Sequence, residues 1–189
     1  MTILIDLLGA PSVGKSTTAG RLFAKLKGME LNVEFVQEFV KQWVYLGRKV
    51  GPYDQFFLFG QEVHNQSHLF NKVDYIISDS PVILAAFYHL YNCKNDVLRE
   101  ACKNFYDMAE HKDNVKVLNF YLPRKKKYQN QGRFHTKEQA DEIDHLLRSY
   151  LDVEGYPYEE LDCPDEDRVD EIMKRLRMVT GDLNGLAWV

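Results

Sequence analysis

A short segment near the N-terminus has the residue types and spacing of a loop that binds the phosphates of a nucleotide. Gly9 and Gly14, followed by Lys15 and Ser16, fit the pattern G-x-x-x-x-G-K-[ST] at every position. In such a loop the glycines let the backbone approach the phosphate oxygens, and successive N–H groups point toward them. The lysine reaches the β- and γ-phosphates, and the serine hydroxyl completes the oxygen shell of Mg²⁺. We therefore expect ATP or GTP, with Mg²⁺, to bind residues Gly9, Ala10, Pro11, Ser12, Val13, Gly14, Lys15, Ser16 and Thr17.

A strand that ends in an acidic residue supplies a second candidate site. The segment 73–81 is apolar and favours a β-strand as far as Asp79. Because ligands bind at the carboxyl ends of the strands of a parallel sheet, we expect the Asp79 carboxylate to hold the Mg²⁺ shell opposite Ser16. The alternative is that Asp79 and Ser80 only cap the helix that begins near Pro81.

The residues around these two sites bear on whether the terminal phosphate goes to water or to another molecule. Asp79 is followed by Ser80 rather than by the second acid that activates water in ATPase motors. A kinase instead needs a carboxylate beside the acceptor hydroxyl. Glu38, at the end of a strand predicted over 32–40, is the candidate, and the alternative is a solvated surface acid.

A basic segment after the fourth predicted strand is the candidate for a lid. Residues 123–136 carry five cations and a glycine, Gly132, that can act as a hinge. Such cations can cover the transferring phosphoryl group and exclude water. Two alternatives remain open, a solvated charged face and a nucleic-acid patch in which aromatic residues alternate with the cations. The cations are Arg124, which we also expect to contact the acceptor, and Lys125, Lys126, Lys127 and Arg133.

The segment 53–61 supplies candidates for the pocket of the acceptor. Tyr53, Phe56 and Phe57 could stack on a base, but aromatic residues at helical spacing are typical of a core. We therefore select only Gln61, whose side-chain amide can recognise the edge of a base.

Two further sets of residues carry weaker signals. Arg168 could contact the adenine side of the nucleotide, but an ion pair with Asp165 along the helix is favoured. The six histidines show no spacing typical of a metal site, so we do not expect zinc.

The rest of the sequence predicts elements that would hold these residues at one edge of a sheet. Strand-like and helix-like segments alternate, which is typical of an α/β fold with a parallel sheet. We expect Asp54 to cap one helix and Gly155 to end another. The predicted strands cover 2–8, 32–40, 73–81, 115–122 and 156–161. The predicted helices cover 17–26, 54–70, 82–91, 96–110, 136–155 and 165–179.

Length and composition limit the classes of protein. A chain of 189 residues is long enough for a sizeable core, and we expect one P-loop domain over 1–189. The net charge of −4 argues against broad nonspecific binding to DNA. No apolar run approaches the roughly 20 residues of a membrane span, and the N-terminus lacks the features of a signal peptide. Three cysteines without a disulfide or zinc pattern favour a cytoplasmic protein.

Several of these segments together resemble a known family. They are "GAPSVGKST", "EFVKQW", the helix with Gln61, "IISDSP" and "NQGRFHTKEQADEIDHLLRSYLDVEGYPYEEL". The chain, from about residue 2 to 176, is similar to small P-loop kinases related to the nicotinamide riboside kinase domain of bacterial NAD-biosynthesis regulators. Similar chains are common in bacteriophages. The phosphate-loop motif is specific for nucleotide, whereas the other motifs are only moderately specific for this family.

The resemblance implies a fold and an activity. It implies a P-loop NTPase fold with a five-stranded parallel sheet flanked by helices, in the three-layer arrangement of nucleoside kinases. It also implies ATP as the donor, Mg²⁺, and a hydroxyl acceptor on a nucleoside-like molecule. The family's strand-end acid matches Glu38, its metal-side acid matches Asp79, and its lid arginine matches Arg133. The lysine run 125–127 departs from the pattern of riboside kinases and favours a more anionic acceptor, such as a nucleotide or DNA.

The sequence therefore predicts a Mg²⁺-assisted ATP phosphotransferase that acts on a hydroxyl or phosphate of a nucleoside-type or nucleotide-type acceptor. Two alternatives remain. One is a kinase that acts on a hydroxymethyl-pyrimidine base in DNA, and the other is an ATP-hydrolysing module or switch that binds nucleic acid. The sequence does not identify the acceptor or the oligomeric state, and it gives no membrane partner.

Overall fold

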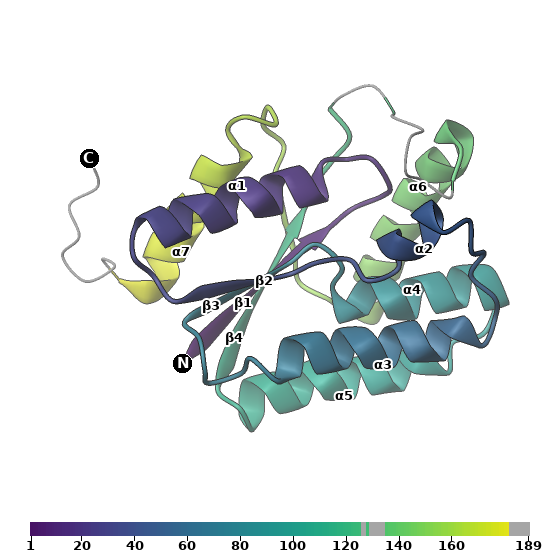
Figure 1. The fold of residues 1–189 in the computed structure, drawn as a ribbon, viewed down its shortest axis with the longest axis horizontal. Coiled ribbons are helices and arrows are strands. Elements are labelled where there is room, and N and C mark those ends of the chain that lie inside the picture. Colours follow the sequence, from purple (N-terminus) through teal and green to yellow (C-terminus); the bar gives the residue numbers. More distant parts are fainter. Residues whose placement is uncertain (126–127, 129–134, 182–189) are drawn as a thin grey trace.

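The apolar strands of the sequence assemble into one parallel sheet with helices on both faces (Figure 1). The computed structural model describes residues 1–125, 128 and 135–181. In them the strand order is β2-β3-β1-β4-β5, and every neighbouring pair is parallel. The five-stranded parallel sheet predicted from the sequence is thus confirmed. The strands are β1 (Thr2–Leu8), β2 (Val33–Val36), β3 (Tyr75–Ser78), β4 (Val115–Tyr121) and β5 (Glu159–Glu160).

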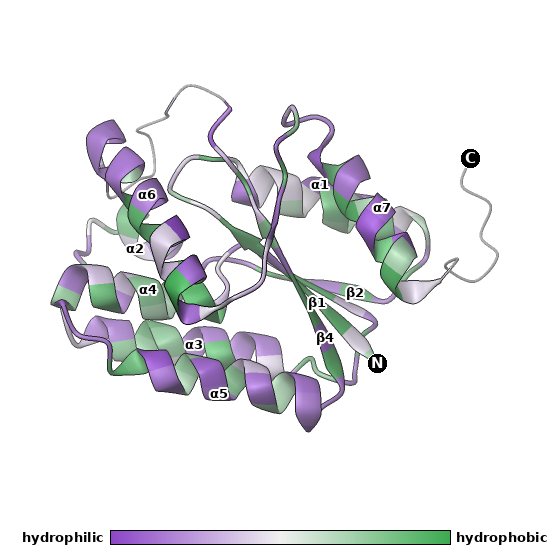
Figure 2. Cartoon of the chain, turned by 180° about the vertical axis from the view of Figure 1, so that it is seen from behind, coloured by the Kyte–Doolittle hydropathy of each residue, from purple (hydrophilic) through white to green (hydrophobic). Residues whose placement is uncertain are grey.

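The helices form a layer on each face of the sheet. α1 and α7 lie side by side on one face, whereas α3, α4 and α5 cover the other and α6 packs beside α4 (Figures 1 and 2). Hydrophobic and hydrophilic residues alternate along the helices (Figure 2), and the buried helix residues are mostly apolar, as the 3.6-residue period of their sequences dictates. They are α1 (Lys15–Gly28), α2 (Lys41–Tyr45), α3 (Asp54–Ser67), α4 (Val82–Cys93), α5 (Leu98–His111), α6 (Lys137–Glu154) and α7 (Arg168–Thr180).

Strand β1 is the centre of the sheet and fixes where the site forms. All seven of its residues are buried, and it pairs with β3 on one side and β4 on the other. The register sets Asp6 level with Ser78 and with Asn119. Because the three strands run in the same direction, the residues that follow them emerge together at one edge, where ligands bind in parallel sheets.

The structure corrects several local expectations from the sequence. β2 ends at Val36, so Glu38 lies in the segment that follows the strand rather than at its end. That segment continues into the short helix α2, which the sequence did not predict. The Asp54 carboxylate accepts a hydrogen bond from the Gly51 N–H instead of capping α3. Gly155 ends α6 in the left-handed conformation (φ 73°), as predicted.

No helix among residues 1–125, 128 and 135–181 has the length and apolar character needed to cross a membrane.

Asp6 places a carboxyl group in the interior of the sheet, directly before the phosphate loop. Its side chain is fully buried, and Oδ2 accepts a 2.7 Å hydrogen bond from the Tyr106 hydroxyl of α5. Burial raises the pKa of Asp6 to about 7, and the Tyr106 hydrogen bond opposes this only in part. A carboxyl that ionises near pH 4 in the unfolded chain therefore keeps its proton longer in the folded protein.

Replacement of this carboxyl by an amide should stabilise the protein more at high pH than at low pH. Because the folded pKa is the higher one, ionisation costs wild-type stability as the pH rises from about 4 through about 7, and Asp6→Asn removes that cost. The gain of Asp6→Asn over wild type should be larger at pH 8 than at pH 5 by on the order of 2 kcal/mol in urea unfolding. The same gain at both pH values would contradict the assignment.

Candidate active site

The phosphate loop forms between β1 and α1 because its backbone adopts conformations that few residues tolerate. Gly9 has φ 138°, and a Cβ atom there would lie 2.8 Å from the carbonyl oxygen of Leu122. Gly14, immediately before α1, has φ 100°. Both positions therefore require glycine. The resulting turn lets the loop lie close to the segment after β4 and directs backbone N–H groups at the start of α1 toward the site.

The ammonium group of Lys15 lies against the loop itself. Its Nζ donates hydrogen bonds to the carbonyl oxygens of Gly9 (2.7 Å) and Ala10 (3.2 Å). The adjacent Ser16 is the second residue of α1 and, like Lys15, is only partly buried. The loop thus holds one cation and one hydroxyl at the start of a helix, as its sequence pattern predicts.

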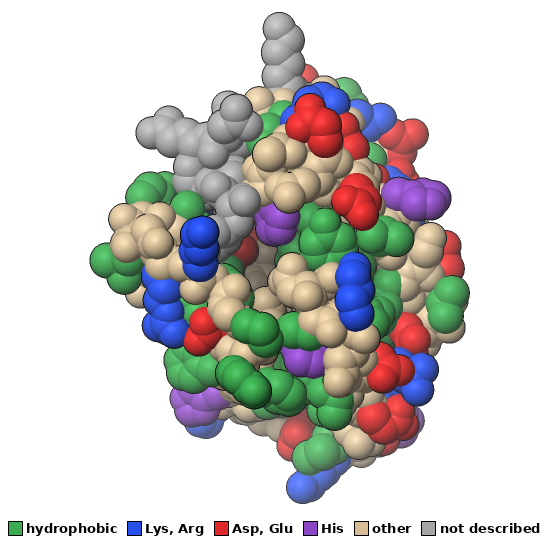
Figure 3. Space-filling model, turned by 90° about the vertical axis from the view of Figure 1, so that its right-hand side faces the viewer, with side chains coloured by type: hydrophobic (Ala, Val, Ile, Leu, Met, Phe, Trp, Pro, Cys, Tyr) green, Lys and Arg blue, Asp and Glu red, His purple; other side chains and the backbone are tan. Residues whose placement is uncertain are grey.

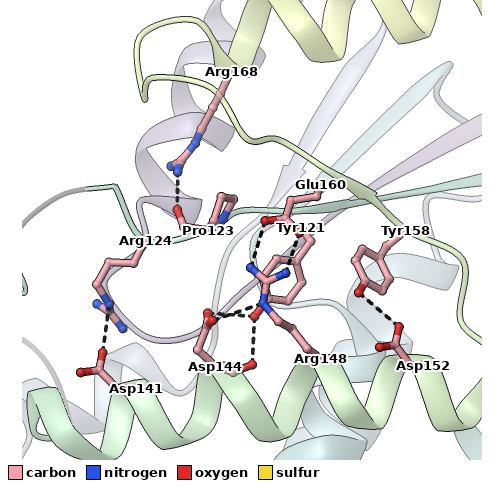
Figure 4. A network of polar contacts seen from close by, with 10 residues as sticks. All are labelled: Tyr121, Pro123, Arg124, Asp141, Asp144, Arg148, Asp152, Tyr158, Glu160 and Arg168. Carbon is pink, nitrogen blue, oxygen red and sulfur yellow. Dashed lines mark hydrogen bonds and ion pairs between the residues drawn. The ribbon is translucent and has the colours of Figure 1, made fainter.

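A buried arginine fixes the outer side of the loop. The guanidinium of Arg168 is fully buried and donates to the carbonyl oxygens of Val13 (2.7 Å) and Pro123 (2.6 Å). Figure 4 shows the bond to Pro123. Arg168 also forms the predicted ion pair with Asp165, at 2.7 Å. Arg168 therefore links the phosphate loop, the segment after β4 and the start of α7.

The two acids predicted from the strand ends lie together. Asp79 follows β3 and is buried, and its Oδ1 accepts a 2.9 Å hydrogen bond from the backbone N–H of Glu38. Glu38 is partly buried and contributes to the wall of the cavity described below. The hydrogen bond fixes the chain after β2 against the end of β3.

A third acid, Glu62 of α3, completes this group and was not predicted from the sequence. Its side chain is only 3% exposed, and Oε1 accepts a hydrogen bond from the Phe39 N–H at 3.5 Å. Burial raises the pKa of Glu62 to about 8, the Phe39 N–H and the nearby Ser80 hydroxyl lower it in part, and the Glu38 and Asp79 charges raise it further. A group that favours its neutral form beside two other acids is typical of a functional site.

One cavity of about 540 Å³ is lined by residues 11–17 of the phosphate loop and by Glu38 and Glu62. The phosphate loop forms one wall, and Glu38 and Glu62 lie in another. A stripe of α3 contributes Gln55, Leu58 and Glu62, whose spacing of three and four residues places them on one helical face. The other residues that contribute are Val40, Lys41, Val44, Lys49, Val50, Gly51, Pro52, Ser80, Leu84, Ala85, Tyr88, Asn92, Cys93 and His135. On this end of the molecule hydrophobic side chains gather over α2 and α3, and the surface is hollowed beside them (Figure 3).

Of the acceptor residues predicted from the sequence, Glu38 lines the cavity, whereas Gln61 and the neighbouring aromatic residues do not. Gln61 is not among the lining residues, and its side-chain amide donates to Asn65 Oδ1 at 2.7 Å along the helix. Tyr53, Phe56 and Phe57 belong to neither the cavity nor the core, since they are 87%, 48% and 50% exposed. The face of α3 that lines the cavity could have been found from the heptad spacing of Gln55 and Glu62, two polar residues on an otherwise apolar stripe.

The described part of the basic segment is held by acidic partners. Arg124 forms an ion pair with Asp141 of α6 at 3.4 Å (Figure 4), and its guanidinium lies over the Tyr128 ring. Lys125 forms an ion pair with Asp162. Neither cation contributes to the wall of the cavity. Lys126, Lys127, Gly132 and Arg133 lie outside the described residues.

Helix α6 is attached to the edge of the sheet near this segment by polar contacts (Figure 4). Arg148 binds both carboxylate oxygens of Glu160 and contacts Asp144, which also accepts a hydrogen bond from the Tyr121 hydroxyl. Thr136 caps the helix through a reciprocal hydrogen-bond pair with Gln139. The helix therefore begins at a fixed point directly after His135, which stacks on Tyr88 at the cavity.

The glycine-dependent loop between β1 and α1, the parallel sheet and the acid after β3 define the fold of the P-loop nucleotide-binding proteins. More narrowly, the chain belongs to the AAA domain family, whose model matches residues 4–168. No curated protein matches the sequence.

Solved structures show the same fold. NadR protein in complex with NR is 16% identical and gives a TM-score of 0.73, over 99% of this chain and 54% of that chain. Deoxyadenosine kinase from M. mycoides, with products dCMP and dCDP bound, is 16% identical and gives a TM-score of 0.60, over 93% of this chain and 99% of that chain. The chain thus spans about half of NadR. These comparisons confirm the P-loop fold of nucleoside-kinase type expected from the sequence.

Removal of the Arg168 guanidinium should destabilise the protein strongly. Arg168→Met leaves the buried carbonyl oxygens of Val13 and Pro123 without these donors, and breaking a buried charged network costs about 3 kcal/mol or more. The matched control is Arg175→Met on the same helix, where an exposed pair with Glu159 is worth less than about 1 kcal/mol. Denaturant unfolding of both variants measures the difference. Equal losses would show that the contacts of Arg168 do not hold the loop.

Proposed function

We propose that the protein is a kinase that transfers the γ-phosphoryl group of ATP to a hydroxyl group of a nucleoside-like acceptor. The observation that carries this proposal is the cavity that joins the phosphate loop to Glu38 and Glu62. A nucleotide hydrolase needs space for one water molecule beside the γ-phosphate. Here the cavity of about 540 Å³ begins at the phosphate loop and extends past Glu38 to α2, α3 and α4. It therefore has room for a small organic acceptor beyond the phosphate-binding end, and apolar and polar side chains line it in similar numbers.

The donor side fits ATP and Mg²⁺. Backbone N–H groups at the start of α1 and the Lys15 ammonium would bind the phosphates, so that Lys15 exchanges its present carbonyl partners for phosphate oxygens. The Ser16 hydroxyl and the Asp79 carboxylate are oxygen donors of the kind that Mg²⁺ prefers, and they would hold the ion. Bound there, Mg²⁺ supplies charge neutralisation for the terminal phosphates.

The acceptor side supplies a base. In the proposed reaction the acceptor hydroxyl oxygen forms a bond to the γ-phosphorus, the bond from that phosphorus to the β–γ bridging oxygen breaks, and ADP leaves. The hydroxyl proton passes to the Glu38 carboxylate, which faces the same cavity as the loop. The hydrogen bond from the Glu38 N–H to Asp79 holds the base at a fixed position relative to the donor side.

The charges of the site favour a hydroxyl over a phosphate as the reacting group of the acceptor. Glu38 and Glu62 line the transfer end of the cavity, with Asp79 bound to the Glu38 N–H, and an acceptor phosphate would be repelled there. Lys125, the described member of the lysine run, is engaged by Asp162 and lies outside the cavity wall. These contacts favour a hydroxyl as the reacting group, whereas Lys41 and Lys49 in the cavity wall are cations that an anionic group elsewhere on the acceptor would face.

Neutralisation of the proposed base should abolish most of the transfer and leave nucleotide binding intact. We expect Glu38→Gln to lower phosphoryl transfer from γ-labelled ATP to nucleosides at least about a hundredfold, which is typical of a lost general base. ATP affinity, measured by calorimetry, should not change because Glu38 does not belong to the loop.

A matched control lies on the preceding strand. Glu34 of β2 is an exposed acid that pairs with Lys27 at 3.6 Å, so Glu34→Gln changes the charge equally without altering the cavity. This variant should retain wild-type transfer. If Glu38→Gln also retained it, Glu38 would not be the base.

A further inference from the structure

The face of α3 that lines the cavity carries two buried polar residues at different positions along the helix. Gln55 and Glu62 are 4% and 3% exposed, and Leu58 lies between them. Seven residues correspond to two helical turns, or about 10 Å along the axis. Glu62 is the one near the transfer end, because its neighbours are Phe39, which follows Glu38, and Ser80, which follows Asp79.

Only one of the two carboxyl oxygens of Glu62 forms a hydrogen bond with the described residues. Oε1 accepts from the Phe39 N–H, whereas Oε2 is buried and has no hydrogen-bond partner within residues 1–125, 128 and 135–181. The nearby Ser80 hydroxyl contributes to the electrostatics of the group without reaching hydrogen-bond geometry with Oε2. A buried polar atom left unpaired is destabilising and needs an explanation.

An anionic partner does not suit this atom. An anionic group would face Glu38 and Asp79, whose charges already disfavour a negative Glu62. A neutral hydrogen-bond donor on the bound acceptor suits the site, and the raised pKa of about 8 for Glu62 lets its neutral form accept or donate such a bond.

We propose that Glu62 is a specificity-determining residue whose Oε2 binds a second hydroxyl group of the acceptor, next to the hydroxyl that receives the phosphoryl group. This inference rests on the kinase function proposed above. The acceptor is then a ring with at least two neighbouring hydroxyl groups, such as the sugar of a ribonucleoside. A molecule with a single hydroxyl, such as a hydroxymethyl-pyrimidine base, leaves Oε2 unpaired and is a poor substrate.

The test compares matched acceptors in three forms of the protein. Ribonucleosides and those of their 2′-deoxy and 3′-deoxy analogues that keep the hydroxyl phosphorylated by wild type are assayed as acceptors with wild type, Glu62→Gln and Glu62→Met. Wild type should prefer the complete sugar by at least about tenfold in kcat/KM over one of the deoxy analogues, the size expected for one lost hydrogen bond in a buried site. Glu62→Gln, which keeps a hydrogen-bonding oxygen, should retain most of this preference. Glu62→Met should reduce it to about one.

The ratio of kcat/KM between matched acceptors separates loss of recognition from a general loss of activity. Loss of the Phe39 contact in Glu62→Met affects both acceptors alike and cancels in the ratio. Two controls lie on the same helix. Gln55→Met, two turns away in the cavity, should lower kcat/KM for both acceptors without changing their ratio, and Gln61→Met, outside the cavity, should leave the ratio unchanged.

Each outcome has a separate meaning. A preference that persists in Glu62→Met, or a wild type that accepts single-hydroxyl molecules equally well, overturns the role of Glu62 and leaves the kinase function intact. Absence of transfer to any acceptor contradicts the kinase function instead. In that case calorimetric binding of the same nucleosides to wild type and Glu62→Met decides the role of Glu62, which is overturned if the nucleosides do not bind or bind both forms with the same preference.

Discussion

The hydrogen bond from the Glu38 N–H to the Asp79 carboxylate, 2.9 Å long, joins the two halves of the site. Asp79 follows β3, which lies beside the strand of the phosphate loop, and Glu38 follows β2, one strand further out. Phosphoryl transfer requires the donor phosphate and the acceptor base to stay aligned within fractions of an ångström. A parallel sheet meets this requirement because the ends of adjacent strands cannot shift without breaking the backbone hydrogen bonds between them. The bond from Glu38 to Asp79 adds one further connection after the last residues of β2 and β3.

Several buried polar groups around the site lower the free energy of unfolding. Asp6 and Glu62 have raised pKa values of about 7 and about 8 because burial disfavours their charge, and Arg168 holds the phosphate loop from a fully buried position. Each would be less costly as an apolar side chain of similar volume. Asp6 precedes the phosphate loop, Glu62 lies beside the proposed base, and Arg168 binds the outer side of the loop. Charged groups in the core of this protein therefore gather around the site.

Local sequence patterns were sufficient for the sheet, for the phosphate loop and for the proximity of Asp79 to Glu38, although β2 ends two residues before Glu38. The loop motif has a fixed backbone geometry, and acids after apolar strands must meet at one edge. The acceptor pocket could not be predicted in the same way, because it depends on how α2 and α3 pack over that edge. Gln61 and Glu62 are neighbours in sequence but point about 100° apart on a helix, so an error of one residue exchanged a residue outside the cavity for one inside it. Lys125 looked like a ligand for an anion until its partner, Asp162, was known.

The fate of the γ-phosphate is the most direct test of the account. Wild-type protein is incubated with γ-labelled ATP, Mg²⁺ and a ribonucleoside panel, and the label is followed in the acceptor and in free phosphate while ADP is measured. The account predicts label on a hydroxyl of at least one nucleoside, in amounts equal to the ADP formed, with little release of phosphate. Label that appears only as free phosphate, at a rate independent of the nucleosides, would contradict it and make the protein a hydrolase.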